Sequence, residues 1–153
     1  MKVLIDTSIL FPALDKDHSI YKEALALIKS LEENHSIVVL NTHLVAELFN
    51  SLSRQPRLPI PVSKVKDILH RLSERYERVD LNMDDYLAAV DRCAQLGLRG
   101  AVIYDALHFQ AAIKAEVDVI YTGNLRDFNR LITDEITFKV ENPLPEDSSK
   151  SKE

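Results

Sequence analysis

The sequence predicts an α/β protein in which a parallel sheet is covered by helices on both faces. Short apolar runs, partly β-branched, alternate along the chain with longer segments whose apolar residues recur at helical spacing. Strands separated in this way pair in parallel through right-handed crossovers, and such sheets are buried on both sides. The chain has 153 residues, of which 46% are hydrophobic, and shows no internal repeat. One domain with one sheet is therefore expected.

The elements of the first third are predicted from apolar spacing. Val3–Ile5 is a short apolar run typical of a buried strand. Residues 19–34 carry apolar side chains at helical spacing with charges between them, which predicts a helix. Residues 37–40 form a second buried strand. Asn41 or Thr42 then caps a helix that extends to residue 54.

Prolines and caps set the boundaries in the middle of the chain. Three prolines between residues 55 and 61 exclude a helix interior, and an apolar stripe restarts a helix over residues 63–76. Residues 78–81 form a candidate short strand. Asn82 is the predicted N-cap of the next helix and Gly97 suits its end. The apolar stripe of that helix consists of Met83, Tyr86, Leu87, Val90 and Ala94.

The last third of the chain completes the alternation of helices and strands. Residues 104–116 form a helix that is apolar nearly all round, which predicts that it is buried. A strand at 117–121, a short helical turn at 125–131 and a strand at 136–140 follow. We predict one domain over residues 1–141. Residues 142–153 are polar and rich in serine and charge, which predicts a disordered C-terminal tail.

The sequence favours a cytoplasmic location and leaves the kind of binding partner open. No apolar run approaches the ~20 residues of a membrane span, and the single Cys93 cannot form an internal disulfide. The apolar run at the N-terminus stops at Asp6, too early for a signal peptide, so a cytoplasmic protein is expected. The net charge of −5 is weak evidence against nucleic acid, because carboxylates at a metal site lower the total and a local basic rim can contact phosphates. A strongly basic protein partner would be equally compatible.

Acidic and amide side chains follow the predicted strands. Asp6 comes directly after the first strand, and Glu47 lies one to two turns into the helix after the second. Asp105 opens the buried helix, and Asn124 and Asp127 follow the strand at 117–121. Ligands of parallel α/β sheets bind at this carboxyl edge. The spacing alone is a weak signal, since turns, solvated helix faces and first helical turns also favour acids.

Carboxylates that converge at one edge of a sheet favour a cation. They repel one another unless a positive ion neutralises them. Oxygen ligands without histidine or cysteine select hard cations, Mg²⁺ or Mn²⁺. Mg²⁺ leaves positions for phosphate oxygens, acidifies a bound water and stabilises charge on the reacting oxygens. This donor set therefore predicts phosphodiester hydrolysis by a metal-dependent nuclease.

Four segments of the chain resemble PIN-domain proteins. They lie in the right order over residues 2–140, and by size the chain is most similar to the VapC-like toxins of prokaryotic toxin–antitoxin pairs. The segments are the opening strand and turn at 3–10, the acidic helix at 45–52, Tyr104–His108, and the strand and loop at 121–128.

The resemblance implies a three-layer α/β/α sandwich with a central parallel sheet. It also implies an Mg²⁺- or Mn²⁺-dependent endoribonuclease, usually a homodimer restrained by a small antitoxin protein. Asp6, Glu47 and Asp105 match the family's metal-binding acids and are the expected catalytic residues. Asn124 stands where many members have an aspartate, with Asp127 nearby, which favours one tightly held ion over two.

Other polar residues are candidates for supporting roles. Thr7 can either help to hold the ion or a phosphate, or satisfy the backbone turn. Asn50 lies one turn after Glu47 and can orient that carboxylate. The histidines show no metal-ligand spacing, and His108, near the third acid, is the one candidate for support of the site. His43 is expected to be a surface or packing residue.

Two other functions stay open from the sequence. The missing charge at Asn124 is compatible with a catalytically silent PIN-like module that binds RNA or a protein. A phosphatase-like hydrolase of small phosphorylated substrates would share the metal chemistry, with Asp6 as its candidate nucleophile.

Overall fold

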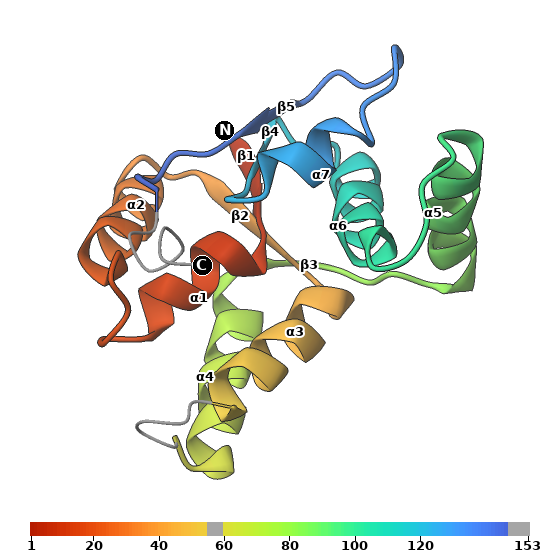
Figure 1. The fold of residues 1–153 in the computed structure, drawn as a ribbon. Coiled ribbons are helices and arrows are strands. Elements are labelled where there is room, and N and C mark those ends of the chain that lie inside the picture. The colour runs from red at the N-terminus through yellow and green to blue at the C-terminus, as the bar shows by residue number, and fades with distance from the viewer. Residues whose placement is uncertain (55–59, 147–153) are drawn as a thin grey trace.

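The computed structural model describes residues 1–54 and 60–146, and helices separate successive strands along the chain, as predicted (Figure 1). In chain order the elements are β1 (Lys2–Ile5), α1 (Thr7–Leu14), α2 (Tyr21–Glu33), β2 (Ile37–Asn41), α3 (Thr42–Ser53), α4 (Val62–Arg75), β3 (Glu77–Val79), α5 (Met83–Gln95), α6 (Val102–Ala115), β4 (Val119–Tyr121), α7 (Leu125–Asn129) and β5 (Lys139–Glu141).

All strands of the sheet are parallel, in the order β3-β2-β1-β4-β5. The central strand β1 pairs with β2 on one side and with β4 on the other. The chain therefore builds the sheet outward from β1 through β2 and β3, and then crosses back to place β4 and β5 on the opposite side. The strand order reverses between β1 and β4, and the carboxyl ends of these two strands form the switch point where such sheets bind ligands.

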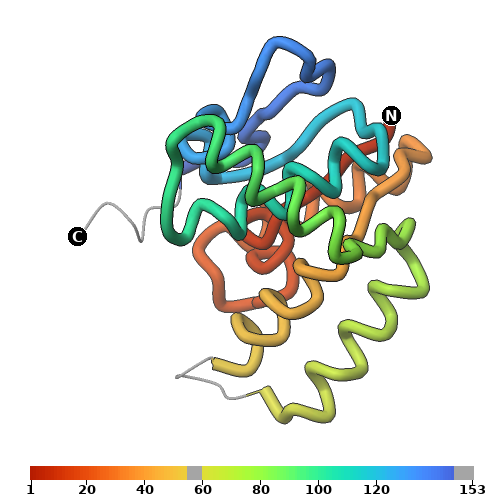
Figure 2. Tube along the Cα trace, turned by 90° about the vertical axis from the view of Figure 1, so that its right-hand side faces the viewer, coloured from red at the N-terminus to blue at the C-terminus, as the bar shows by residue number. Residues whose placement is uncertain are grey.

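Two apolar cores lie on opposite faces of the sheet, which makes the fold a three-layer α/β/α sandwich as predicted. Successive side chains of a strand point to opposite faces. Val3 and Ile5 accordingly pack with α1, α2, α3 and α4, whereas Leu4 packs with α5, α6 and α7. Figure 2 views the molecule from the second face, where α6 covers the sheet and α5 lies outside it.

The helix α6 is buried, as its apolar sequence predicts, but the apolar stripe predicted on α5 does not face the core. Met83 is 73% exposed, and the remaining members of the stripe are exposed as well. The inner face of α5 carries Asp85, Ala89 and Cys93. Asp85 can be buried because it closes the capping box with Asn82 and accepts a hydrogen bond from Lys114 at 2.6 Å.

The structure adds one helix, α1, to the sequence prediction and changes the assignment of part of the C-terminal region. The sequence does not predict α1, because Pro12 stands inside it. Leu144 belongs to the region assigned to the tail, but it is buried in the first core. The remainder of the predicted tail, from residue 147, and most of the proline segment lie outside the described residues. None of the helices in the described ranges has the length and apolarity that crossing a membrane requires.

Candidate active site at the carboxyl ends of β1 and β4

Asp6 lies at the switch point of the sheet and serves as the N-cap of α1. Its side chain is buried, with an exposed fraction of 5%. Oδ1 accepts hydrogen bonds from the backbone N–H and the hydroxyl of Ser8, and Oδ2 accepts one from the Thr122 hydroxyl at 2.7 Å. A carboxylate offers about four lone-pair positions, so one position on Oδ2 is left for a ligand. Asp6 thus combines the capping role with a free oxygen position.

Asp105 and Asp127 face each other across the amide of Asn124. The Nδ2 atom of Asn124 donates to Asp105 Oδ2 at 3.3 Å and to Asp127 Oδ2 at 3.0 Å. Arg130 donates to the other oxygen of Asp127 at 3.1 Å. Asn124 therefore supplies hydrogen atoms between two carboxylates, and Asp127 already has a cationic partner. Of the two carboxylates, Asp127 is paired with a cation, and Asp105 receives only the neutral amide of Asn124 among these contacts.

Glu47 reaches the site from α3 and is held by three side chains. The Thr7 hydroxyl donates to Oε2, and Nε2 of His108 lies 3.1 Å from Oε1. Nε2 of His43 lies 2.6 Å from the same Oε1, as an ion-pair contact without the alignment of a hydrogen bond. The His43 ring in turn stacks on Tyr104, with ring centroids 5.3 Å apart. Glu47 is therefore fixed by contacts from three different helices.

The protonation of the acids reflects these surroundings. Burial raises the pKa of Asp6, against the opposing effect of its hydrogen bonds from Ser8 and Thr122. Burial and the neighbouring Asp6 carboxylate raise the pKa of Asp105 to about 6. Burial would also raise the pKa of Glu47, but the hydrogen bond from His108 and the close approach of His43 outweigh it and hold that pKa well below its ordinary range. The folded protein therefore disfavours the charged form of Asp6 and Asp105, and it stabilises the charged form of Glu47.

The fold brings the three predicted acids to one edge, together with residues that the sequence did not assign. The repulsion that Asp6, Asp127 and Glu47 each exert on Asp105 shows that the carboxylates share one electrostatic environment. Of the two roles predicted for Thr7, the structure shows a contact with the site, because its hydroxyl donates to Glu47. Asn50 is exposed, and the contacts that hold Glu47 within the described residues come from other side chains, so its role stays a prediction.

Thr122 and His43 were not predicted as part of the site. Thr122 is fully buried and bridges the site, because it donates to Asp6 and accepts from the backbone N–H of Asn124 at 2.9 Å. It lies in the segment 121–128 that resembles the PIN family, but no role was predicted for it there. His43 stands four residues before Glu47, and this i, i+4 spacing on a helix is a signal that could have identified it.

The fold and the site together define a class of protein: an α/β sandwich that gathers carboxylates at the switch point of a parallel sheet. The family model for the PIN domain matches residues 3–132, and the chain belongs to the PIN-domain family. As a family, PIN-domain proteins are nucleases. No curated protein matches the chain significantly.

Solved structures of a VapC toxin and of VapBC complexes are similar to this fold at low sequence identity. The toxin VapC20 of Mycobacterium tuberculosis, described as cleaving the sarcin–ricin loop, is 20% identical with a TM-score of 0.66, over 88% of this chain and 98% of that one. VapBC2 of Rickettsia felis, bound to a promoter DNA fragment, is 23% identical with a TM-score of 0.62, over 93% and 98%. DNA-bound VapBC of Salmonella typhimurium is 17% identical with a TM-score of 0.63, over 94% and 98%.

Proposed function

We propose that the protein is a divalent-metal-dependent endoribonuclease of the VapC type, the toxin of a toxin–antitoxin pair acting in the cytoplasm. The observation that carries the proposal is the convergence of Asp6, Glu47 and Asp105 at the switch point of the sheet, in a chain of the PIN family. The similarity in fold to VapC20 and to VapBC complexes supports RNA as the substrate and a small antitoxin as the partner.

The donor set fits one hard cation, Mg²⁺ or Mn²⁺. Asp6 and Asp105 would bind it directly, because both are acids whose charge is poorly compensated in the folded protein. Glu47 would complete the site through Oε2. Asn124 donates to Asp105 and is itself held by Asp127, and the amide in the fourth position is the reason to propose one ion.

When bound, the ion supplies Lewis acidity and lowers the pKa of a bound water. The chain's own residues orient the site. Ser8 and Thr122 direct Asp6, Asn124 directs Asp105, and His108 and Thr7 hold Glu47 as an anion that can accept a hydrogen bond from the attacking water. Because the same contacts lower the pKa of Glu47, its part is to orient the attacking water through a hydrogen bond rather than to take its proton.

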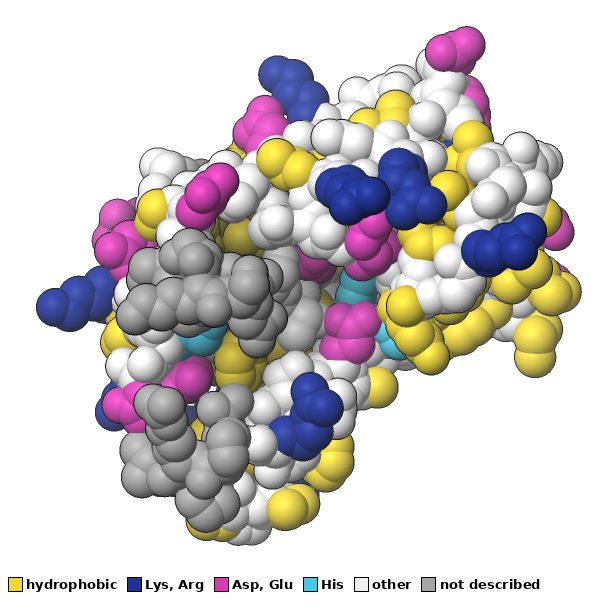
Figure 3. Space-filling model, in the orientation of Figure 1, with side chains coloured by type: hydrophobic (Ala, Val, Ile, Leu, Met, Phe, Trp, Pro, Cys, Tyr) yellow, Lys and Arg dark blue, Asp and Glu magenta, His cyan; other side chains and the backbone are white. Residues whose placement is uncertain are grey.

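A groove beside the acids provides a path for the RNA strand. It has a volume of about 660 Å³ and is lined by Thr7, Ser8, Asn124 and Arg126 next to apolar residues such as Phe11. Figure 3 shows acidic and histidine side chains gathered in a hollow, with Lys and Arg side chains on both sides of it. Arg126 of α7 is exposed and can contact backbone phosphates, which offsets the negative net charge locally.

The test of this function is cleavage of a panel of structured RNAs, including a sarcin–ricin loop oligonucleotide, by the purified full-length protein. Cleavage is expected in Mn²⁺ or Mg²⁺, is expected to stop in excess chelator, and should return when the ion is restored. Cleavage that persists in chelator would refute the metal-dependent mechanism. Metal titration serves as the control, since a protein that binds no Mn²⁺ at millimolar concentration would instead favour the silent binding module suggested by Asn124.

The exposed stripe of α5 supports a homodimer. Met83, Tyr86, Leu87 and Val90 share one face of the helix and are all exposed. An apolar face of this kind commonly marks an interface.

Leu87→Glu is expected to weaken self-association by about 10- to 100-fold, the equivalent of the 1.5–3 kcal/mol gained by burying one leucine. Sedimentation velocity over a concentration series measures it; unchanged association, or the same loss with the exposed Glu74→Ala on α4, would refute this interface.

A further inference from the structure

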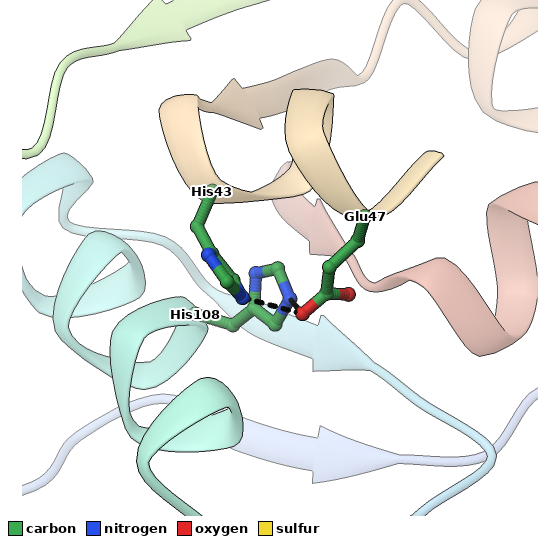
Figure 4. A group of neighbouring side chains, drawn as sticks. All are labelled: His43, Glu47 and His108. Atoms are coloured by element: carbon green, nitrogen blue, oxygen red, sulfur yellow. Dashed lines mark hydrogen bonds and ion pairs between the residues drawn. The ribbon is translucent and has the colours of Figure 1, made fainter. Parts of the chain in front are cut away.

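Two histidines approach Glu47 at the candidate active site and form a cluster with it. The rings of His43 on α3 and His108 on α6 both point at the Glu47 carboxylate (Figure 4). One ligand atom from each residue lies within 4.8 Å of the others. Two histidines and one glutamate are the ligands of many catalytic zinc ions. By composition and distance alone, the cluster is therefore a candidate zinc site.

The hydrogen-bond partner of His108 decides against zinc. A histidine that binds a metal through Nε2 carries its hydrogen on Nδ1 and donates it to an oxygen acceptor. In this protein Nδ1 of His108 faces the Nδ2 group of Asn41 at 3.0 Å. An amide nitrogen is a donor and never an acceptor. A hydrogen on Nδ1 would therefore set two donors against each other.

The orientation of the Asn41 amide is fixed independently of His108. Asn41 is the N-cap of α3, and its Oδ1 accepts the backbone N–H of Leu44 at 3.0 Å. Turning the amide over would face Nδ2 toward that N–H and abolish the cap. Asn41 and His108 are each 1% exposed, so water cannot replace a lost partner. The cap of α3 thus determines which nitrogen of His108 carries the hydrogen.

We propose that Asn41 locks His108 in the tautomer with its hydrogen on Nε2, so that His108 clamps Glu47 instead of binding a transition metal. Nε2–H then donates to Glu47 Oε1 at 3.1 Å. Asn41 and His108 are positioning residues, since they act through Glu47. With its hydrogen on Nε2, His108 cannot offer that nitrogen to zinc, so the cluster of His43, Glu47 and His108 does not compete for metal with the oxygen donors of the site.

The clamp also limits how Glu47 can take part in the reaction. Both histidines approach Oε1, and Thr7 donates to Oε2. Of about four lone-pair positions on a carboxylate, one on Oε2 stays available. Glu47 can therefore contact an ion or a water through a single oxygen. This last step rests on the proposed function, whereas the tautomer does not.

The first test measures the tautomer in the unmodified full-length protein. Long-range ¹H–¹⁵N correlation spectra at mildly alkaline pH distinguish protonated from unprotonated ring nitrogens, and a spectrum of His108→Gln assigns the signal among the five histidines. We expect His108 to show a protonated Nε2 and an unprotonated Nδ1. The reverse pattern would overturn the proposal.

The second test replaces the Asn41 amide that fixes the tautomer of His108. Asn41→Asp retains an N-cap residue and presents an acceptor to Nδ1, and is expected to raise zinc affinity about 10- to 100-fold, the range by which such outer partners tune metal sites. Competition with a chromophoric zinc chelator measures it, with Asn41→Ser as the matched variant that keeps the cap and adds no carboxylate. His43→Gln should cancel the gain.

The outcomes separate this proposal from the proposed function. Unchanged zinc affinity in a folded Asn41→Asp protein, or a gain that survives loss of His43, would refute the lock. Neither measurement uses RNA, so absence of ribonuclease activity would refute the proposed function and leave the tautomer result intact.

Discussion

Asp6→Asn is expected to lower metal-dependent RNA cleavage by about 10²- to 10³-fold, because Asp6 provides a negative oxygen that the proposed ion needs. The substitution replaces that oxygen by an amide NH₂ group at the same place. A neutral amide binds a hard cation more weakly, and its NH₂ end cannot bind one at all. The expected loss corresponds to several kcal/mol of transition-state stabilisation.

The fold should survive this substitution, so that loss of activity reports on the ion. The amide oxygen can keep the capping hydrogen bond from the backbone N–H of Ser8, and the NH₂ group can donate to the Thr122 hydroxyl, which has a free lone pair. Removing a buried charge also removes the cost that raises the pKa of Asp6. Initial rates in Mn²⁺ and thermal unfolding measure both properties, with the exposed Asp17→Asn as the control. An active Asp6→Asn protein would refute the assignment of Asp6.

The sequence predicted the sheet and the buried helix because both depend on short-range apolar pattern. Val3–Ile5 and residues 37–40 are strands, and α6 is buried, as the pattern indicates. The orientation of α5 could not be predicted in the same way. Its inner face includes Asp85, which is tolerated there because it closes the capping box with Asn82 and because Lys114 on α6 pairs with it. Partners on other helices are not visible in the spacing of one helix.

The same limit applies to the site. The strand-end rule placed Asp6, Glu47 and Asp105 at one edge because it depends only on topology. The residues that orient them depend on contacts between distant segments. Thr122 reaches Asp6 across 116 positions, and Asn41 reaches His108 across 67. Such contacts follow from the packed fold, and no local pattern encodes them.

Asp105→Asn is expected to stabilise the metal-free protein at neutral pH by about 1–2 kcal/mol. The pKa of Asp105 is raised from 3.8 to about 6, so the folded protein holds its proton more tightly than the unfolded chain does. A shift of two units corresponds to about 3 kcal/mol, which solvent screening of a half-buried group reduces. The asparagine retains an oxygen that can accept the hydrogen bond from Asn124.

The sign of the pH dependence follows from the raised pKa. As the pH rises from 3.8 to about 6, the unfolded chain loses the Asp105 proton first, and the folded protein loses stability relative to it. Above that range the penalty is constant, and below it the penalty vanishes. The stability difference between Asp105→Asn and the unmodified protein should therefore be near zero at the acid end and reach its full value near neutral pH. Urea unfolding in chelator at both pH values measures it.

A bound ion should reverse this order of stability. The ion binds the folded unmodified protein and stabilises it by about 2.7 kcal/mol at a concentration 100 times its dissociation constant. Asp105→Asn would gain little, because it lacks the carboxylate. At neutral pH the variant is thus expected to be the more stable protein in chelator and the less stable one in saturating Mg²⁺ or Mn²⁺. If the ion stabilised both proteins equally, Asp105 would not be a ligand, and its raised pKa would reflect burial and neighbouring charge alone.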